Sequence, residues 1–380
     1  MATETAILAG KIGAAVMQAS MNKAAGWWYS PHMAAASRAI AERIPLVDLV
    51  LEVRDARIPL TSRFEPLKVY PPSSRRIVVL NKADLANRSQ LKEWISYMEH
   101  HKQICYGVNS HNEKSIHKFL NFLQAQIRLL KKLDYHNSTT TVMLVGIPNV
   151  GKSVLVNSLH KIGRISAAEK GKLRHATVSP QPCETKDIKS FKIASHPNVY
   201  VLDTPGVLPP LISEVEVCSK LALTGTISDC LVDEKELAQY FLSILNSSEE
   251  YKKWAELFTD GEAEHTSHSD LEMKSKRRYA SDHTQAFVVD DVRRNLYEEA
   301  SSFHGRSADN RDTMRLIELQ LEALFGAFRV PRDLGEDCCL KVCRKLLNLY
   351  RTGRLGHYTL DPVPNYSSYA SSFSIIQDII

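Results

Sequence analysis

The sequence predicts an α/β protein in which a doubly wound, mostly parallel six-stranded sheet is followed by an all-helical domain. Three observations predict this. Six strand-like runs lie before residue 203, helical patterns alternate with several of them, and only helical patterns follow Pro209. At 380 residues the chain is long enough for two or three domains of about 150 residues each.

The predicted strands come first in the chain, and most of them read as buried. They cover 46–53, 76–80, 104–108, 142–147, 188–193 and 199–202. The first, second, fourth and sixth are nearly continuous apolar runs, which is typical of strands covered on both faces. The alternating helical patterns cover 89–100, 115–133 and 151–162, and the later ones cover 213–224, 234–245, 289–303, 309–325 and 333–350.

These elements predict four segments along the chain. The sheet domain takes 27–210 and the helical domain takes 211–361. We expect a disordered insertion near 259–295, because its run TDGEAEHTSHSD holds no large apolar side chain that could enter a core. The Ser- and Tyr-rich residues 362–380 read as a loose tail, and 1–26 read as a transit peptide or a disordered tail.

The N-terminus allows both of these interpretations. Residues 1–41 hold a single acid, Glu4, against Lys11, Lys23 and Arg38, and apolar residues recur near helical spacing. An amphipathic start that is poor in acids is typical of an organelle presequence, although presequences are usually rich in Arg.

Composition sets limits on the function. The formal net charge of +5 is compatible with an RNA partner without indicating one by itself. The seven cysteines form no CxxC pair, which favours a reducing compartment over a disulfide framework. No run of about 18 apolar residues occurs, so we predict no transmembrane segment.

The most specific motif is a phosphate-binding loop at 146–153, GIPNVGKS, which matches G-x-x-x-x-G-K-[ST] between a strand and a helix. Its backbone N–H groups and the helix N-terminus would face phosphate oxygens, Lys152 would reach the β- and γ-phosphates, and the Ser153 hydroxyl would bind Mg²⁺. A chance Gly-Lys-Ser turn is the alternative, and the strand–loop–helix context disfavours it. The predicted nucleotide contacts here are Asn149, Val150, Gly151, Lys152, Ser153 and Val154.

Two further motifs follow predicted strands. At 81–84, NKAD offers Asp84 to the two N–H donors of guanine, Asn81 to the base edge and to neighbouring loops, and the Lys82 stem to the base ring. At 203–206, DTPG offers Asp203 as a ligand to Mg²⁺ through water and the Gly206 N–H as a sensor of the γ-phosphate.

Either short motif could be an ordinary surface turn on its own. All three motifs at strand ends in one chain predict a single guanine-nucleotide site.

The order of the motifs is unusual. Ras-like GTPases carry the phosphate loop first, DxxG second and NKxD third, whereas here NKAD comes first and DTPG last. The same site forms when the old termini are joined and the chain is opened elsewhere, with 131–140 as the joining linker. The chain thus resembles the circularly permuted YlqF/RbgA-type GTPases, and their mitochondrial branch most closely. Further matching segments are DARIP at 55–59, WYSPHM at 28–33 and RTGRLG with TLD within 351–361.

The resemblance implies further site residues. It nominates Thr185 as the switch residue that closes on Mg²⁺, although Cys183 replaces the usual glycine of that stretch. It places the Ser110 backbone against the base. Asn149 matches a K⁺ ligand of related enzymes, with a turn-stabilising role as the alternative.

The same resemblance bears on hydrolysis. Val207 stands where Ras-type enzymes carry a glutamine that orients water, so we predict slow intrinsic hydrolysis. The resemblance nominates His32 to complete the reaction, and simple packing of His32 is the alternative.

The resemblance also implies partners and location. It implies GTP hydrolysis, assembly of the large ribosomal subunit through its rRNA, and the matrix side of mitochondria with peripheral association with the inner membrane. Nucleolus, cytoplasm and chloroplast remain alternatives, as do a non-hydrolysing GTP-switch adaptor and an RNA-binding scaffold, and the oligomeric state stays open.

A basic stretch at 338–360 would contact RNA phosphates and bases. Its cations are Lys341, Arg344, Lys345, Arg351 and Arg354, with Tyr350 and Tyr358 between them. A second basic zone covers 161–192, and an ordinary solvated face is the alternative for the first stretch.

Overall fold

The computed structural model describes residues 3–21, 31–69, 75–133, 139–166, 188–195, 197–209, 212, 214–248, 250–255, 282–304, 310–331 and 336–364. The chain divides into two compact units. The sheet unit comprises Tyr29–Pro209 and Tyr358–Ile380, and the helical unit comprises Met1–Trp28 and Pro210–His357.

The sheet unit contains the predicted six-stranded, mostly parallel sheet. Its strands are β1 Leu49–Asp55, β2 Arg76–Asn81, β3 Ile104–Val108, β4 Thr139–Val145, β5 Lys189–Ser195 and β6 Asn198–Asp203. They lie in the order β3-β2-β1-β4-β6-β5, and only the β5–β6 pair is antiparallel. The first strand begins three residues later than predicted, because Pro45 starts a 3₁₀ turn at Ile44–Leu46.

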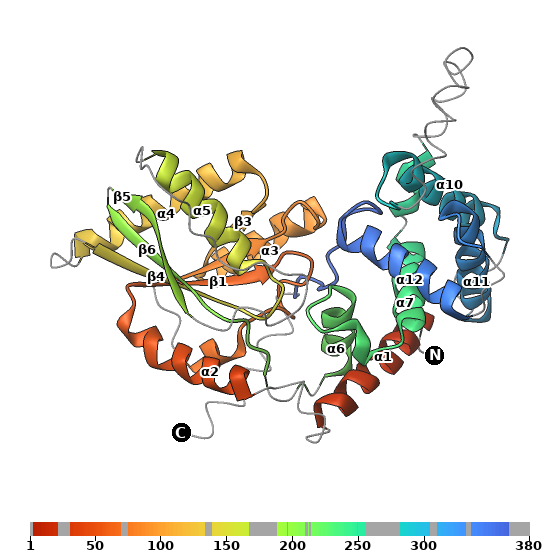
Figure 1. Ribbon diagram of the computed structural model, residues 1–380, viewed down its shortest axis with the longest axis horizontal. Helices are drawn as coiled ribbons and strands as arrows, with labels where there is room; N and C mark the ends of the chain where they lie inside the picture. Colours follow the sequence, from red (N-terminus) through yellow and green to blue (C-terminus); the bar gives the residue numbers. More distant parts are fainter. Residues whose placement is uncertain are drawn as a thin grey trace, which may run out of the picture. The chain divides into compact units, whose positions relative to one another are not determined.

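Helices cover both faces of this sheet, which explains the continuous apolar strands. The parallel register aligns Val50 with Met143 on one face, where α2 Pro31–Arg43 packs. On the same face α3 Arg88–His100 packs over the β2 side chains. The opposite face is covered by α4 Glu113–Leu133 and α5 Lys152–Ser166 (Figure 1). The carboxyl ends of β1, β2 and β4 therefore share one edge, where the motif loops begin.

The helical unit is built from helices that lie before and after residues 256–281 in the chain. They are α1 Glu4–Met21, α6 Val215–Leu223, α7 Glu234–Ser248, α10 Ala286–Ser302, α11 Asn310–Ala327 and α12 Glu336–Arg351. Because α10 begins at Ala286, the predicted insertion near 259–295 is wrong for its last ten residues. Residues 256–281 lie outside the described part. Among the described helices, none has the length and hydropathy needed to span a bilayer.

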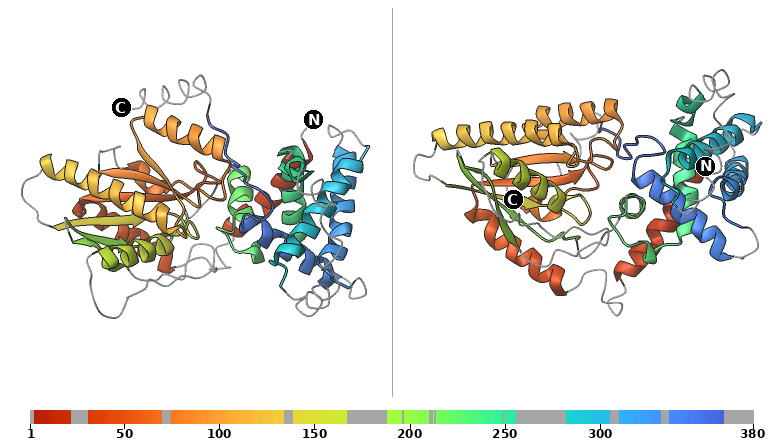
Figure 2. Two further views of the ribbon diagram at one scale, coloured as in Figure 1. Left: turned by 90° about the horizontal axis from the view of Figure 1, so that it is seen from above. Right: turned by 45° about the horizontal axis from the view of Figure 1, so that its top comes forward.

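The N-terminal helix α1 corrects the prediction of a disordered tail. Leu8, Ile12 and Val16 recur every fourth residue and form a buried stripe. The helix lies beside α6 and α7 in both figures (Figure 1; Figure 2). A Cβ on Gly13 would lie 2.1 Å from the Val215 carbonyl oxygen, so the missing side chain lets the two backbones approach. The first residues of the chain thus belong to the helical unit, and cleavage after residue 26 would remove part of its core.

The C-terminal boundary also differs from the prediction. Residues 358–361 were expected to close the helical domain, but they belong to the sheet unit. The Leu360 N–H donates to the Arg57 carbonyl oxygen at 2.7 Å, and Asp361 is buried there. Of the predicted loose tail, residues 365–380 lie outside the described part.

Candidate functional site

The phosphate loop joins β4 to α5, as the motif predicts. Gly151 has φ of +91°, and a Cβ there would lie 2.3 Å from the Asn81 amide nitrogen. Asn149 also takes a left-handed conformation, with φ of +58°. The Lys152 ammonium is buried and donates to the carbonyl oxygens of Gly146 at 3.0 Å and Ile147 at 2.8 Å. The loop therefore presents its amides and a cation at the start of α5, which suits a phosphate chain.

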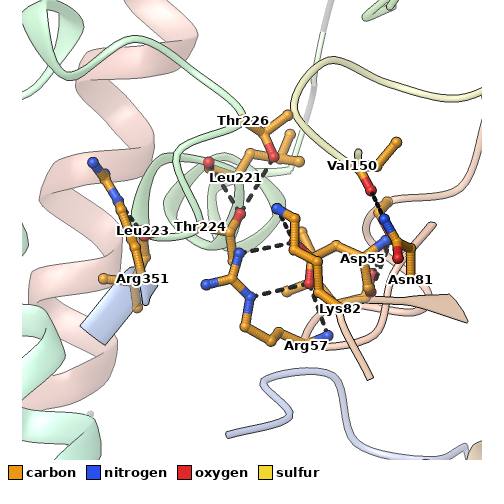
Figure 3. Close-up of polar contacts among 12 residues, drawn as sticks. Asp55, Arg57, Asn81, Lys82, Val150, Leu221, Leu223, Thr224, Thr226 and Arg351 are labelled. Carbon is orange, nitrogen blue, oxygen red and sulfur yellow. Dashed lines mark hydrogen bonds and ion pairs between the residues drawn. The ribbon is translucent and has the colours of Figure 1, made fainter. Parts of the chain in front are cut away.

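Hydrogen bonds of the Asn81 side chain, here called the Asn81 latch, join this loop to the base-recognition motif. The Asn81 amide donates to the Val150 carbonyl oxygen at 2.8 Å (Figure 3). The Asn81 amide oxygen accepts from the Ser110 hydroxyl at 2.6 Å. Ser158 of α5 donates in turn to the Ser110 carbonyl oxygen at 2.8 Å. Three loops that follow β2, β3 and β4 are thus held together by one buried amide.

The Ser110 hydroxyl in this latch was not foreseen. The resemblance predicted only that the Ser110 backbone would contact the base. The serine lies right after a strand at the motif edge, and that place was the only signal available in the sequence.

The base-recognition loop presents Asp84 to solvent. The Leu85 N–H donates to the Lys82 carbonyl oxygen at 2.9 Å and closes the turn that carries Asp84. Asp84 is exposed, and its predicted contact with guanine stays a prediction.

The DAR segment is joined to this loop by an ion pair between Asp55 and Lys82. The Arg57 side chain holds Asp55 through two nitrogens at 3.0 and 2.8 Å, and the Lys82 ammonium lies 2.9 Å from the same carboxylate (Figure 3). Burial opposes ionisation of Asp55, yet the two cations hold its pKa well below the usual range. Because Lys82 has φ of +58°, the ion pair fixes a backbone conformation that few non-glycine residues adopt. The sequence named both motifs but not this contact between them.

The residues predicted to bind Mg²⁺ meet at the end of β6. The Ser153 hydroxyl donates to one Asp203 carboxylate oxygen at 2.9 Å. The other Asp203 oxygen is buried and has no hydrogen-bond partner among the described residues. Burial raises the pKa of Asp203, against the Ser153 hydrogen bond and the nearby Lys152 charge. An orphaned carboxylate oxygen beside a hydroxyl fits a hard cation such as Mg²⁺.

The DTPG turn is packed against the phosphate loop. The Thr204 hydroxyl donates to the Leu144 carbonyl oxygen at 2.6 Å. A Cβ on Gly206 would lie 2.6 Å from Pro148 Cα and 3.1 Å from the Lys152 ammonium, so this position needs glycine. Val207 is buried in the apolar cluster under the sheet.

The remaining predicted site residues are placed as follows. His32 is exposed at the start of α2, and Val154 lies in the first turn of α5. Thr185 and Cys183 lie outside the described residues, as do Trp28, Tyr29 and Ser30.

The basic C-terminal stretch differs from the prediction of an aromatic, RNA-stacking surface. Tyr350 and Tyr358 are buried and cannot stack on bases. Arg351 makes a bidentate ion pair with Asp229 at 2.7 Å and donates to the Ala222 carbonyl oxygen at 3.0 Å. It also donates to the Leu223 carbonyl oxygen at 3.1 Å (Figure 3). It therefore closes the C-terminus of α6, which is a structural role.

Other cations of that stretch remain at the surface. Lys341, Arg344 and Arg354 are exposed, and Arg344 pairs with Glu234. Lys345 is half-buried against the Phe328 ring. In the second basic zone Lys170, Lys172, Arg174 and Lys186 lie outside the described residues.

Comparison with known proteins agrees with this geometry. Residues 141–294 match the protein family described as "50S ribosome-binding GTPase". The chain is 56% identical to DAR GTPase 2, mitochondrial, from Arabidopsis thaliana. The 375 matched residues cover 97% of this chain and 98% of that protein. It is 42% identical to Short integuments 2, mitochondrial, from the same plant, over 89% of each chain.

A bacterial relative is more distant. Ribosome biogenesis GTPase A of Bacillus pumilus is 31% identical over 232 residues, which cover 60% of this chain and 78% of that protein. The shuffled motif order, the DAR segment at the base loop and the similarity over nearly the full length agree. The chain belongs to the circularly permuted, YlqF/RbgA-type family of DAR GTPases.

Proposed function

We propose that this GTPase is an assembly factor for the large ribosomal subunit on the matrix side of mitochondria, where its nucleotide state controls its association with rRNA. The observation that carries the proposal is the Asn81 latch, because it joins the shuffled base and phosphate motifs into one site with Lys152, Ser153 and Asp203 in place. The description of the matching family, "50S ribosome-binding GTPase", and the words "Ribosome biogenesis" and "mitochondrial" in the names of relatives support the partner and the compartment.

The proposed reaction is in-line attack of water on the γ-phosphate of GTP. Lys152 would stabilise the charge that spreads over the phosphate oxygens, and Asp84 would select guanine. Ser153 and Asp203 would hold Mg²⁺, with Thr185 as a further ligand. The cation would neutralise the β- and γ-phosphate oxygens when it is bound.

Hydrolysis without a partner should be slow. Val207 is apolar and buried, so it cannot orient the attacking water. We assign to His32 the role of the missing glutamine in hydrolysis. Its side chain is exposed and is available to enter the site once a ribosomal particle is bound. A K⁺ ion beside Asn149 would add to the positive charge at the phosphates.

The exposed cations of the helical unit would meet the rRNA. Lys341 and Arg354 are the cations in that basic stretch whose side chains face solvent without a described ion pair. They favour contacts with phosphates over stacking on bases, since the tyrosines beside them are buried.

Single-turnover hydrolysis of GTP, measured with and without purified mitochondrial large subunits, tests the proposal. We expect slow hydrolysis alone and at least about tenfold faster hydrolysis with the particles. His32→Ala should lose this stimulation while it still binds GTP, and Lys152→Ala serves as the inactive control.

Three outcomes would contradict the proposal in different ways. Binding of GTP without turnover in either condition would indicate a switch adaptor. Association with particles without GTP binding would indicate a scaffold. Equal stimulation by small subunits would refute the assignment to the large subunit.

A further inference from the structure

Residues Tyr358–Asp361, here the C-terminal strap, lie across the two turns that follow β1 and β2. The Leu360 N–H donates to the Arg57 carbonyl oxygen at 2.7 Å in the first turn. In the second turn the Tyr358 N–H donates to the Leu85 carbonyl oxygen at 3.3 Å. The Asn87 N–H donates to the Thr359 hydroxyl at 3.2 Å, directly before α3. The strap thus binds the far end of the base-recognition loop.

Asp361 anchors the strap through a buried carboxylate. One of its oxygens accepts from the backbone N–H groups of Leu60 at 2.8 Å and Thr61 at 2.7 Å, and the other accepts from the Thr61 hydroxyl at 2.8 Å. The Trp94 indole donates to the Asp361 carbonyl oxygen at 3.1 Å. Hydrogen bonds to an ionised carboxylate are stronger than neutral ones, so this anchor holds the turn at 57–61 firmly.

The turn after β1 connects the strap to the near end of the same loop. Arg57 accepts from the strap with its carbonyl oxygen and holds Asp55 with its side chain. Asp55 in turn holds the Lys82 ammonium (Figure 3). The Ala56 N–H also donates to the Asn81 carbonyl oxygen at 2.8 Å. The loop that carries Asp84 is therefore held at both of its ends, once through the DAR segment and once directly.

We propose that the C-terminal strap is a positioning element for guanine recognition, and that releasing it speeds the dissociation of the nucleotide. The inference rests on the assignment of Asp84 to the base in the proposed function. None of the strap residues touches the nucleotide in this account, so each acts through the loop. Because the strap follows α12 in the chain after only six residues, it gives the helical unit a covalent route to the base site.

The rate of GDP release from full-length variants tests this proposal, measured by stopped flow with a fluorescent GDP analogue. Asp361→Asn and Thr359→Val should release GDP about tenfold and about threefold faster, as expected for the loss of charged and neutral hydrogen bonds. His357→Ala is the matched control, because this exposed residue directly precedes the strap and should leave release unchanged.

A second measurement separates positioning from a loss of stability. Inosine diphosphate lacks the exocyclic amine that Asp84 would accept from, so a displaced loop lowers the preference for GDP over inosine diphosphate. General destabilisation of the fold weakens the binding of both nucleotides equally. Thr61→Val, which keeps the backbone bonds to Asp361, provides the readout if Asp361→Asn does not fold.

Unchanged release in the variants, or an equal loss of affinity for both nucleotides, would overturn the proposal. Failure of the proposed function would look different. In that case the unmodified chain would show no preference for GDP over inosine diphosphate, or no stimulation by large subunits, whatever the state of the strap.

Discussion

Glu52 and Asp55 are two carboxylates buried on opposite faces of β1. Glu52 lies on the face covered by α2 and accepts from Arg54 at 2.9 Å and from the Phe64 N–H at 2.8 Å. Arg76 of the neighbouring strand binds the same carboxylate. A buried charge is tolerated only when it is paired and fully hydrogen-bonded, and both conditions hold here. The two carboxylates thus bind residues of the segment after β1, Asp55 at Arg57 and Glu52 at Phe64.

Glu52 makes unfolding of the sheet unit depend on pH. Burial raises the pKa of Glu52, but Arg54 and Arg76 outweigh it and lower the pKa from 4.5 to about 2. A depressed pKa stabilises the fold above pH 4.5, and that stabilisation is lost as the pH falls from 4.5 towards 2. The difference corresponds to about 3 kcal/mol of unfolding free energy.

Urea unfolding followed through the buried Trp94 should show this slope in the natural chain. Glu52→Gln should be less stable at pH 7 and should lose less stability on acidification. Parallel pH profiles for the two proteins would contradict the assignment.

Sequence reasoning located single residues well where a local motif fixes their chemistry. Lys152, Ser153, Asp203 and Asn81 lie where their motifs predict, because a strand end and a short loop determine the place. The anchoring role of Asp361 escaped prediction, since its partner Thr61 lies 300 residues away and no periodicity links the two.

At the scale of elements, α1 shows what periodicity can and cannot decide. The four-residue spacing of its apolar side chains predicts an amphipathic helix, but it does not say what the helix packs against. The partners are α6 and α7, about two hundred residues further along the chain. Only tertiary packing distinguishes such a helix from a loose targeting segment.

Two glycines of α1 give a matched test of this packing. A Cβ on Gly10 meets nothing within 4 Å, so Gly10→Ala should stabilise the helix by up to about 1 kcal/mol. A Cβ on Gly13 would clash with Val215, so Gly13→Ala should destabilise by about 1–3 kcal/mol. Thermal unfolding of the two variants measures the difference. Equal effects of the two substitutions would show that α1 does not pack on α6.

The C-terminal end of α12 offers a second comparison at this scale. Arg351→Ala should cost about 2 kcal/mol of stability, because it breaks the bidentate pair with Asp229 and frees the last carbonyls of α6. Arg354→Ala should leave the melting temperature unchanged but weaken binding to large subunits and flatten its salt dependence. Melting curves and sedimentation with particles separate these effects. A stability loss in Arg354→Ala, or none in Arg351→Ala, would reverse the two roles.

For the whole molecule, the shuffled motif order decides how the units are connected. The chain passes between them three times, after residues 28, 209 and 357. The second passage directly follows DTPG and the third directly precedes the C-terminal strap. Both ends of the nucleotide site are therefore joined covalently to the helical unit, which suits a switch whose ordering is read by a second domain.

The three motifs at strand ends predicted a single nucleotide site in spite of their shuffled order. The sequence could not predict the threefold passage, because the pairing of α1 with α6 and of Asp361 with Thr61 leaves no local pattern.

Equilibrium binding of GTP and xanthosine triphosphate tests most directly whether the shuffled segments enclose one guanine nucleotide. The natural chain should prefer GTP, and Asp84→Asn should move the preference towards xanthosine triphosphate by at least about tenfold, because the amide can donate to the xanthine oxygen that replaces the guanine amine. Lys152→Ala should weaken the binding of both nucleotides by the same factor. If Asp84→Asn instead keeps the full preference for GTP, the base is bound elsewhere and the account of the site is wrong.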